Sequence, residues 1–530
     1  MKQKSEFLRA EVTREEALSM FQENKFKLEL ISGLPEGETV SVYRVGPMVD
    51  LCTGPHIPHS GLAKSVWLHQ ASRSYWRADV NREHLMRVYG VTFPDDKQMK
   101  QHKHRIEEAK KRDHRTLGIA HDLFFFHQLS PGSCFFTPHG ARVYHAMMGL
   151  IREKYWEYEY SEVITPNIFN FKLWETSGHA QHYKQNMFSF NIESEEFGMK
   201  PMNCPAHCVM FKERARSYRD LPLRVADFGV LHRNEFSGAL HGLTRVRRFQ
   251  QDDGHIFCRH DQVQQEVQGF LRFLDEVYGV FGLEYELKLS TRPEDYLGEL
   301  EMWNAAEAGL KDALTSFGKP WELNEGDGAF YGPKIDITVF DALGRSFQCA
   351  TVQLDFQLPI RFDLKYAREA SVAADDERYE RPVIVHRAVL GSVERMFAIL
   401  VEHFACKWPL WLNPRQVMIV PVSEKFAAYA ATVRQRLRAE RLFVDVDGTD
   451  RKMQKKVREA QLEQYNYILV VGKEEEDAQT VNVRTRDNVV HGAMELDVLV
   501  ECIRKERDGR EKASGLHAAR AAAEMAKASL

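Results

Sequence analysis

The chain has 530 residues, of which 44% are hydrophobic and 28% are charged, and its formal net charge at pH 7 is -4. One hydrophobic core rarely extends over so many residues, so we expect three or four domains of about 100 to 200 residues each. The composition excludes an intrinsically disordered chain, and the slightly negative charge argues against a protein that coats nucleic acid non-specifically.

No segment has the sequence of a membrane span or an export signal. The most apolar stretch, residues 396–412, is interrupted by Glu402, His403 and Lys407, whereas a span needs about 20 apolar residues in a row. Residues 1–11 are charged and lack the apolar centre of a signal peptide. We therefore expect a soluble, cytoplasmic protein without a membrane partner, with a removed organelle-targeting segment as the alternative.

The first predicted domain covers residues 1–93. Short apolar runs such as KLELI alternate there with turn signals such as GLPEGE, and the compact segment VDLCTGPHIPHSG follows. This mixture predicts a small α+β domain. The eight cysteines of the chain are spread over its whole length and lack the density of a disulfide scaffold, so we interpret them as reduced thiols.

A charged helix is predicted next. Residues 95–115 contain many charges, few large apolar side chains and no Gly or Pro, which is typical of a solvated helix. We place a linker at residues 94–118. Two interpretations remain open for it, an ordinary charged surface helix and a face that contacts RNA.

Residues 119–412 form the largest predicted domain. Long helical patterns occur there with strand-like runs that are not regularly interleaved, which favours an antiparallel sheet over a βαβ repeat. Two of these runs, VADFGVLHRNE and RRFQQDDGHIF, flank a glycine-containing loop. Because residues two apart share a face of a strand, Arg233 and Glu235 should point the same way. The return strand should present one row of side chains, namely Phe249, Gln251, Asp253 and His255.

This row could be an exposed polar sheet face. The interleaved phenylalanines instead favour a surface that combines an amide, a carboxylate and an imidazole beside a guanidinium. A third segment, RPVIVHRAVLGSVERMFAILVEHF, predicts a strand ending near Leu390, a break at Gly391 and Ser392, and an amphipathic helix. Arg395 then lies in the first helical turn, where the helix dipole disfavours a cation. We infer a functional role, either binding a phosphate or stacking on a base.

The predicted C-terminal domain spans residues 413–506. The strands VMIVPV, LFVDV and YNYILVVG alternate with helical patterns at residues 424–440 and 451–464, which predicts a compact α/β domain. The Ala-rich tail, residues 507–530, has no apolar face. We interpret the tail as a frayed helix, disordered chain or a non-native remnant.

Three segments of residues 119–412 resemble the signature motifs of class II aminoacyl-tRNA synthetases. The first is REKYWEYEYSEVITP with Pro166, the second HRNEFSGALHGLTRVRRFQQDDGHIF and the third HRAVLGSVER. Together with KPMNCPAH, FYGPKIDI and CATVQLDF they are similar to the threonyl-tRNA synthetase family, over residues 25–506. The resemblance implies ATP-dependent activation of threonine to threonyl-adenylate and transfer to the 3′-terminal adenosine of tRNA(Thr).

The same resemblance implies the fold and the assembly. The expected architecture is α+β, with a class II antiparallel sheet and flanking helices, a C-terminal α/β anticodon-binding domain and a partial editing-type domain at the N-terminus. The first motif, residues 152–166, usually builds a two-fold interface, so we expect a homodimer.

The resemblance also assigns ATP contacts. Arg233 would hold the α-phosphate and the threonine carboxylate, and Arg395 would stack on adenine near the γ-phosphate. Positioned cations and Mg²⁺ suit this chemistry because they neutralise the charge of pyrophosphate. The further residues expected around ATP and the adenylate are Glu235, Arg245, Phe249, Lys334, Gln348, Thr351 and Gln353.

A zinc site follows from the resemblance, although the local pattern CPAHC suggests a different one through Cys204, His207 and Cys208. The family ligands correspond to Cys204, His255 and His386, with an open fourth position for substrate. Threonine would bind there through its amine and hydroxyl groups, with Asp253 accepting from the hydroxyl that valine lacks. The other residues expected to contact threonine are Met202, Gln251, Tyr331 and Gln353.

Two further assignments rest on the resemblance. His179, in TSGHAQHY, would accept a proton during transfer, although it could equally be a hydrogen-bonded pocket residue, and His182 is a neighbouring candidate. Anticodon contacts fall on Arg458, Glu475 and Arg484, groups suited to reading single-stranded bases. Charged residues on a solvated face are the alternative for these three.

The sequence departs from the family in its editing region. Family members of the bacterial type carry HxxxH and, later, CxGPH, which together hydrolyse misacylated serine. Here Cys52 and His56 match the second motif, with Asp50 and Lys27 as companions, but no histidine precedes His56. We therefore expect that a preceding portion was removed or never present, and that this chain does not edit.

The sequence disfavours two alternative identities. A seryl or prolyl class II enzyme is disfavoured by Asp253 and by the expected zinc ligands. A non-catalytic relative that binds tRNA or regulatory mRNA would be favoured by loss of Arg233 or Arg395, and both are present.

Overall fold

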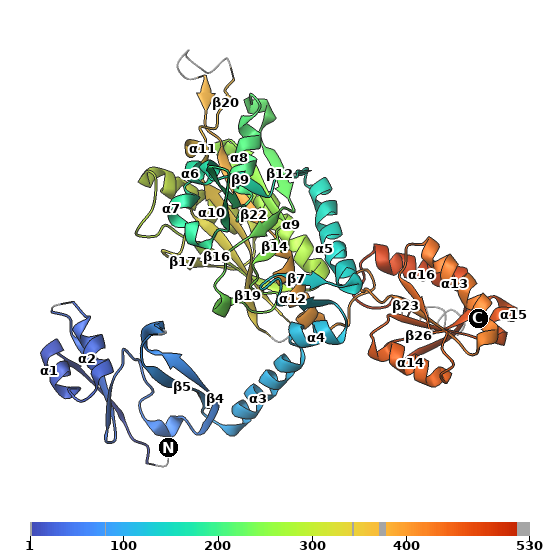
Figure 1. Ribbon diagram of the computed structural model, residues 1–530, viewed down its shortest axis with the longest axis horizontal. Coiled ribbons are helices and arrows are strands. Elements are labelled where there is room, and N and C mark those ends of the chain that lie inside the picture. Colours follow the sequence, from blue (N-terminus) through green and yellow to red (C-terminus); the bar gives the residue numbers. More distant parts are fainter. Residues whose placement is uncertain (1–2, 36, 80, 342–343, 370–377, 517–530) are drawn as a thin grey trace. The chain divides into compact units, whose positions relative to one another are not determined.

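The computed structural model describes residues 3–35, 37–79, 81–341, 344–369 and 378–516 (Figure 1). The chain divides into two compact units, Met1–Lys110 and Lys111–Leu530. None of the helices in the described ranges has the length and apolar character that crossing a membrane requires. Most of the tail predicted at residues 507–530 lies outside the described residues.

The first unit contains a small antiparallel sheet, a helical pair and a long hairpin, which confirms the predicted α+β character. Ala17, Ile31 and Val42 are buried between the helices and the sheet. The sheet has the order β1-β2-β3 and the hairpin pairs β4 with β5. The elements are β1 (Phe7–Val12), α1 (Arg14–Met20), α2 (Lys25–Ser32), β2 (Val40–Val45), β3 (Met48–Leu51), β4 (Ser65–Tyr75) and β5 (His84–Phe93).

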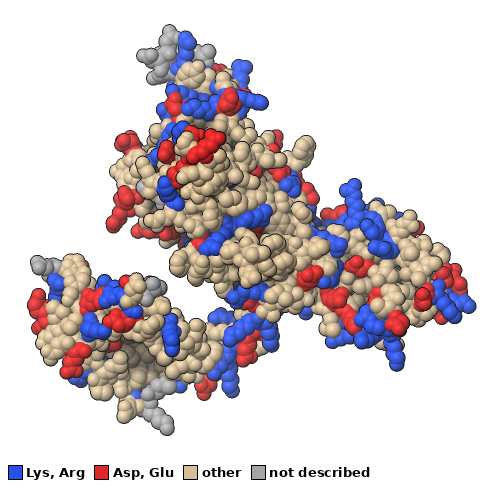
Figure 2. Space-filling view, viewed as in Figure 1, with Lys and Arg blue, Asp and Glu red and all other residues tan. Residues whose placement is uncertain are grey.

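The charged helix predicted at residues 95–115 is shorter than expected. It forms α3 (Asp96–Lys111), whose surface carries mixed basic and acidic side chains (Figure 2). A separate helix, α4 (His114–Ala120), follows because the Asp113 carboxylate accepts a hydrogen bond from the Arg115 N–H at 2.8 Å and caps a new N-terminus. The prediction of one continuous helix to residue 115 is therefore wrong.

The second unit is built on an eight-stranded sheet with the order β17-β16-β18-β19-β22-β15-β12-β8. The six inner strands are antiparallel, as predicted, while the outer pairs β16/β17 and β12/β8 are parallel. The sheet is therefore mixed at its edges. A helical crossover between β16 and β17 permits their parallel pairing. The strands are β8 (Ser161–Glu162), β12 (Leu223–Asp227), β15 (Asp253–Cys258), β16 (Glu284–Ser290), β17 (Trp321–Asn324), β18 (Lys334–Phe340), β19 (Ser346–Asp355) and β22 (Val383–Ala388).

Four long helices share one hydrophobic core with this sheet (Figure 1). Met396, Phe397 and Leu400 are buried in it, as the amphipathic pattern predicted. The Ser392 hydroxyl accepts from the Arg395 N–H at 3.1 Å and begins the last of the four helices, which places Arg395 in the first turn. The helices are α5 (Pro138–Glu157), α9 (Val263–Phe281), α10 (Leu300–Phe317) and α12 (Val393–Phe404).

The predicted hairpin around the glycine-containing loop is present but interrupted. β13 (Val230–His232) pairs with β14 (Arg248–Gln250), and β12 pairs separately with β15. The strand expected to carry the row from Phe249 to His255 is not continuous, because β14 ends at Gln250 and β15 begins at Asp253. Between them, the buried carboxylate of Asp252 accepts from the backbone N–H groups of Val389 and Leu390, both at 2.8 Å.

Short elements complete the unit around the sheet. They are β6 (Phe124–Phe126), β7 (Cys134–Phe136), β9 (Ile168–Asn170), α6 (Lys172–Ser177), α7 (His179–His182), β10 (Ser189–Ile192), β11 (Glu195–Met199), α8 (Cys204–Lys212), α11 (Gln357–Arg361), β20 (Tyr366–Ala367) and β21 (Tyr379–Glu380).

The C-terminal part of the second unit is the predicted α/β domain. Its sheet has the order β24-β23-β25-β26-β27, in which the first three strands are parallel. Val417, Leu469 and Val483 are buried in its core. Its elements are β23 (Val417–Pro421), α13 (Ala427–Ala439), β24 (Val444–Val446), α14 (Met453–Leu462), β25 (Tyr467–Val471), α15 (Lys473–Ala478), β26 (Thr480–Thr485), β27 (Val490–Glu495) and α16 (Leu496–Asp508).

Candidate active site

One thiol and two imidazoles from three separate segments meet at the central sheet. Cys204 is the first residue of α8, and His255 on β15 lies directly opposite His386 on β22. One ligand atom from each of the three residues lies within 4.8 Å of the others. His255 Nε2 and His386 Nδ1 are 2.9 Å apart. The register of two antiparallel strands therefore brings the two imidazoles together, and the start of α8 supplies the thiol.

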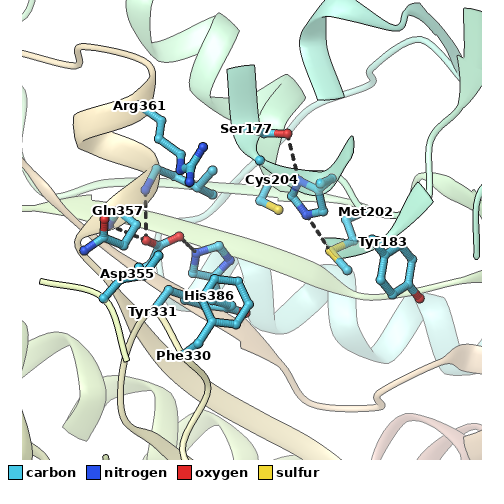
Figure 3. A pocket seen from close by; sticks show the side chains of 14 residues that line it. Ser177, Tyr183, Met202, Cys204, Phe330, Tyr331, Asp355, Gln357, Arg361 and His386 are labelled. Carbon is cyan, nitrogen blue, oxygen red and sulfur yellow. Dashed lines mark hydrogen bonds and ion pairs between the residues drawn. The ribbon is translucent and has the colours of Figure 1, made fainter. Parts of the chain in front are cut away.

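The second nitrogen of each imidazole has its own partner. His386 Nε2 lies 2.9 Å from the Asp355 Oδ2, as Figure 3 shows, and His255 Nδ1 lies 2.7 Å from His207 Nδ1. Burial lowers the pKa of His255. These contacts orient both rings so that one nitrogen of each remains toward Cys204.

The local CPAHC alternative is not assembled. Cys208 is buried in an apolar cluster with Phe211 and Leu221, and His207 contacts His255 instead of joining the group. All eight cysteines lie in the described residues, and none forms a disulfide. One thiol and two imidazoles with supported second nitrogens form a donor set that suits Zn²⁺.

An apolar cavity opens beside this group (Figure 3). Tyr331, on its wall, donates from its hydroxyl to Gln353 Oε1 at 2.8 Å. Nearby, Asn203 Nδ2 donates to Asp253 Oδ2 at 3.1 Å, and burial raises the pKa of Asp253. The other predicted contact, Met202, also lines the cavity.

His179 lines the same cavity. Its Nδ1 lies 2.7 Å from the Ser177 hydroxyl, and its Nε2 lies 3.1 Å from the Met202 sulfur, which can only accept a hydrogen bond. Burial lowers the pKa of His179 to about 4, so the ring is neutral near pH 7. The His182 side chain lies outside the described part of the structure.

A second, polar cavity holds the two motif arginines. The Arg233 guanidinium lies 4.9 Å from the centre of the Phe249 ring and 6.0 Å from that of Tyr183, which lines the first cavity. Arg233 therefore lies between the two cavities. Arg245 pairs with Glu235 at 2.8 Å, and these residues line the second cavity together with Gln251.

Two hydrogen bonds fix the Arg395 side chain to the wall of this cavity. Its Nε donates to the Thr244 carbonyl at 3.1 Å and its Nη1 to the Gln348 carbonyl at 3.0 Å. The neighbouring Glu394 is buried, which raises its pKa to about 7, and its carboxylate accepts from the Gln250 N–H at 3.0 Å. The first turn of α12 is thus held against β14.

Lys334 is not in the arginine cavity. Its ammonium group pairs with Asp336 at 2.8 Å and with Asp327 at 3.5 Å, and Gln348 Nε2 donates to the same Asp336 at 2.7 Å. Thr351 lies opposite Asp336 on the paired strand β19. These residues form a polar patch on β18 and β19.

Three residues around the site escaped sequence reasoning. Asp355 and Asn203 lie within CATVQLDF and KPMNCPAH, segments that carry the resemblance, but no local pattern indicates which side chain they contact. Ser177, two residues before His179, could have been found as a hydroxyl within reach of the ring.

The predicted anticodon residues lie on three elements of the C-terminal domain. Arg458 is exposed on α14. The Glu475 carboxylate accepts from the Gly472 N–H at 2.9 Å at the start of α15. Arg484 lies half-buried on β26.

The predicted editing residues form two pairs in the first unit. His56 Nε2 lies 3.1 Å from the Cys52 sulfur, and Lys27 pairs with Asp50 at 2.8 Å. His56 stacks on Phe7 with ring centres 5.0 Å apart. His56 is exposed and Cys52 half-buried.

Comparison with known proteins places these features in a family. Residues 188–404 match the tRNA synthetase class II core domain (G, H, P, S and T), and residues 416–506 match an anticodon binding domain. The crystal structure of the RNA binding domain of threonyl-tRNA synthetase from Cryptosporidium parvum Iowa II aligns with a TM-score of 0.71 and 53% identity. That alignment covers 74% of this chain and 98% of the other.

Two curated relatives match over nearly the whole chain. Mitochondrial threonine–tRNA ligase 1 of Arabidopsis thaliana is 61% identical over 500 residues, which cover 94% of this chain and 70% of the relative. Cytoplasmic threonine–tRNA ligase 1 of Rattus norvegicus is 55% identical over 513 residues, 97% of this chain and 73% of the relative. The chain therefore belongs to the threonyl-tRNA synthetase family, a family of threonine–tRNA ligases with a class II catalytic core.

Proposed function

We propose that this chain activates threonine with ATP and transfers the threonyl group to the 3′-terminal adenosine of tRNA(Thr). Family membership supports the reaction. The observation that carries the proposal is the position of Arg233 between a polar cavity with further arginines and an apolar cavity beside the Cys204 group. A cation there can contact both reactants.

Activation needs positioned charge more than covalent chemistry. The threonine carboxylate attacks the α-phosphorus of ATP, and pyrophosphate with its Mg²⁺ leaves. Arg233 would hold the carboxylate and the α-phosphate, while Arg395 and Arg245 would stabilise charge on the other phosphates and the adenine. The groups proposed to complete the ATP and adenylate pocket are Glu235, Phe249, Lys334, Gln348, Thr351 and Gln353.

The apolar cavity would bind the threonine side chain. Cys204, His255 and His386 would hold a zinc ion, which when bound supplies a Lewis acid for the amine and hydroxyl of threonine. Asp253, oriented by Asn203, would accept a hydrogen bond from the hydroxyl. The remaining contacts would come from Met202, Gln251, Tyr331 and Gln353.

Transfer to tRNA would use His179. Its Nδ1 is held by the Ser177 hydroxyl, and its Nε2 faces the Met202 sulfur beside the apolar cavity. Because its pKa is lowered to about 4, the ring is neutral near pH 7 and can accept a proton over the physiological range.

Each part of the chain would have a separate function. Residues 119–412 would form the catalytic domain, and residues 413–506 would bind the anticodon through Arg458, Glu475 and Arg484. Residues 94–118 would form a linker, and residues 507–530 a tail. Residues 1–93 would be a partial editing-type domain. We propose that this domain does not hydrolyse misacylated tRNA, because Cys52 and His56 lack the HxxxH partners.

We propose a homodimer built on the first motif. Trp156 at the end of α5 and Ile164 after β8 are 88% and 92% exposed, and large apolar side chains so exposed favour a protein partner. The two-fold interface of class II enzymes would cover them. Sedimentation velocity at micromolar concentration should show a dimer, and a fully active monomer would contradict the proposal.

A cytoplasmic location is proposed as well. The support is the identity of 53 to 55% with the cytoplasmic ligases of several eukaryotes, although the relative that is 61% identical is mitochondrial. Fractionation of cells that express the full-length protein would test it.

Amino-acid-dependent pyrophosphate exchange tests the reaction. Threonine should support exchange with ATP, and proline should not. A chain that binds tRNA(Thr) but shows no exchange with any of threonine, serine, valine or proline would support the non-catalytic alternative instead.

A further inference from the structure

We propose that His114 is a positioning residue for the ATP-binding loop, residues 241–245. The inference rests on the proposed function, because this loop presents Arg245 and Thr244 to the polar cavity. His114 lies at the start of α4, more than 120 residues before the loop in the sequence, and it does not line that cavity. It does line an adjoining cavity with Thr244, Arg245 and Arg395, but its side chain is almost fully buried, so it would act on catalysis through the loop.

One buried imidazole connects three elements. His114 is 2% exposed. The Leu243 N–H donates to His114 Nε2 at 3.1 Å, so this nitrogen is the acceptor and Nδ1 carries the proton. Nδ1–H donates to Glu402 Oε1 at 2.7 Å, and the His114 backbone N–H donates to the same oxygen at 2.9 Å. A single neutral tautomer therefore joins α4, the loop and α12.

The backbone of the loop lies very close to the imidazole ring of His114. Gly242 has a φ of +49°, and a Cβ atom there would lie 2.1 Å from His114 Nε2. Only a glycine allows the backbone to approach the imidazole so closely. The next residue, Leu243, is fully buried and makes the hydrogen bond to the ring. The loop is thus anchored at its tip.

The anchor lies next to the catalytic arginines. Thr244 follows Leu243, its hydroxyl donates to the His241 carbonyl at 2.7 Å, and its own carbonyl accepts from Arg395 Nε. Arg245, which follows, pairs with Glu235. If Leu243 lost its acceptor, the loop could shift and both guanidinium groups would lose their fixed positions relative to ATP.

A metal ion is a poorer explanation of the same residues. Donor atoms of Asp113, His114 and Glu402 lie within 4.8 Å of one another, as a metal would require. However, both His114 nitrogens already have partners, and Glu402 also pairs with Arg345. Asp113 is occupied by Arg115, with the Arg115 Nε 3.0 Å from its Oδ1. The polar atoms of these residues are therefore already used in hydrogen bonds and ion pairs within the protein.

Two substitutions separate the functions of the two nitrogens. The amide of His114→Asn can replace Nδ1 as the donor to Glu402 but cannot reach Leu243. The carbonyl of His114→Gln can replace Nε2 as the acceptor for Leu243. A buried N–H without a partner costs enough to change binding by about tenfold. We therefore expect His114→Asn to raise the KM for ATP about tenfold and His114→Gln to leave it near wild type, with the KM for threonine unchanged in both.

The measurement is threonine-dependent pyrophosphate exchange by the full chain, with ATP and threonine varied separately. His121→Asn, at the end of the same helix and without a side-chain contact to the loop in the described residues, is the matched control. Thermal unfolding of each variant reports stability independently.

A second pair of variants uses the close approach of Gly242. Gly242→Ala should raise the KM for ATP because its methyl group collides with the ring. In the background of His114→Ala the same change should have a smaller effect, because the collision with the ring is gone while the positive φ and the Arg115 side chain, 3.0 Å from the Cβ position, still oppose it. Equal effects in both backgrounds would show that the loop is not held by His114.

Three results would overturn the inference. They are an unchanged KM for ATP in His114→Asn, an equal rise in His114→Gln, and a loss of stability in both variants without a selective ATP effect. Each leaves the proposed function intact as long as the wild-type chain shows threonine-dependent exchange. Absence of exchange in the wild type would instead refute the proposed function.

Discussion

The chain contains two groups of cysteine and histidine that differ in how they are built. Cys52 and His56 are four residues apart in one loop of the first unit, joined by a single 3.1 Å contact and open to solvent. Cys204, His255 and His386 come from three segments and are mostly buried, and each ring has a second partner.

The difference shows that residues close together in the sequence need not form the more buried and better supported group. The exposed pair needs only a local turn, and solvent can hydrate both of its side chains. The buried group requires the register of β15 with β22, and its low-dielectric surroundings strengthen every polar contact. We therefore expect discrimination and catalysis to depend on the buried group, and the exposed pair to contribute little by itself.

The largest expected effect is the rejection of valine at the buried group. Valine would leave Asp253 without the hydroxyl that we propose it binds. A site built for a hydroxyl rejects such an analogue by about 10⁴- to 10⁵-fold, whereas one missing methyl group, as in serine, yields only about 10- to 200-fold. The ratios of kcat/KM in pyrophosphate exchange measure both. Valine activated within 100-fold of threonine, taken as about the limit of apolar discrimination, would contradict the assignment.

The next largest effect is expected for substitutions of the motif arginines. Arg233→Ala and Arg395→Ala should each lower threonine activation by about 10²- to 10³-fold, the scale of losing one preorganised donor. Arg458→Ala, in the C-terminal domain, is the control and should leave exchange unchanged. Exchange near wild type in either motif variant would refute its catalytic role.

Metal binding separates the three-segment group from the local CPAHC pattern. Cys204→Ala should abolish stoichiometric zinc, whereas Cys208→Ala should retain it. Asp355→Asn removes the carboxylate behind His386 and should weaken zinc affinity by about 10- to 100-fold. Metal analysis and competition with a chelator give these values. Zinc retained by Cys204→Ala and lost from Cys208→Ala would favour the local pattern.

The smallest expected effect concerns the exposed pair. Serine keeps the amine and hydroxyl of threonine, so the chain should form some Ser-tRNA(Thr). Deacylation of this product by the chain should match spontaneous hydrolysis, and a double variant with Cys52→Ala and His56→Ala should behave identically. Rapid deacylation that the double variant abolishes would show that the first unit edits without HxxxH.

The predicted start of a helix was confirmed where interactions between neighbouring residues decide the structure. Arg395 lies in the first turn of α12, as predicted, because Ser392 caps the helix and Gly391 adopts a positive φ before it. The predicted end of the charged helix was wrong because Asp113, a strong N-cap residue, begins a new helix instead of continuing the old one. Capping competes with helix extension, and the charge pattern alone did not distinguish them.

Contacts between segments far apart in the sequence were predicted less well. The row from Phe249 to His255 was expected on one regular strand, but β14 ends at Gln250 and β15 begins at Asp253, with Asp252 between them bonded to two N–H groups near the end of β22. The contacts of Asp355, His207 and His114 were not anticipated at all. Each contacts a residue at least 31 positions away in the chain, and no periodic pattern encodes such a pairing.

The sequence by itself determined the class of the protein and the chemical groups available to it, because the class II motifs are contiguous stretches whose residues can be recognised without a fold. Only the tertiary structure decided which of these groups meet. His255 and His386 are 131 residues apart and face each other because two strands pair in one register, and burial then lowers the pKa of His255. Strand pairing is governed by the packing of the whole sheet, so this information does not reside in any single segment.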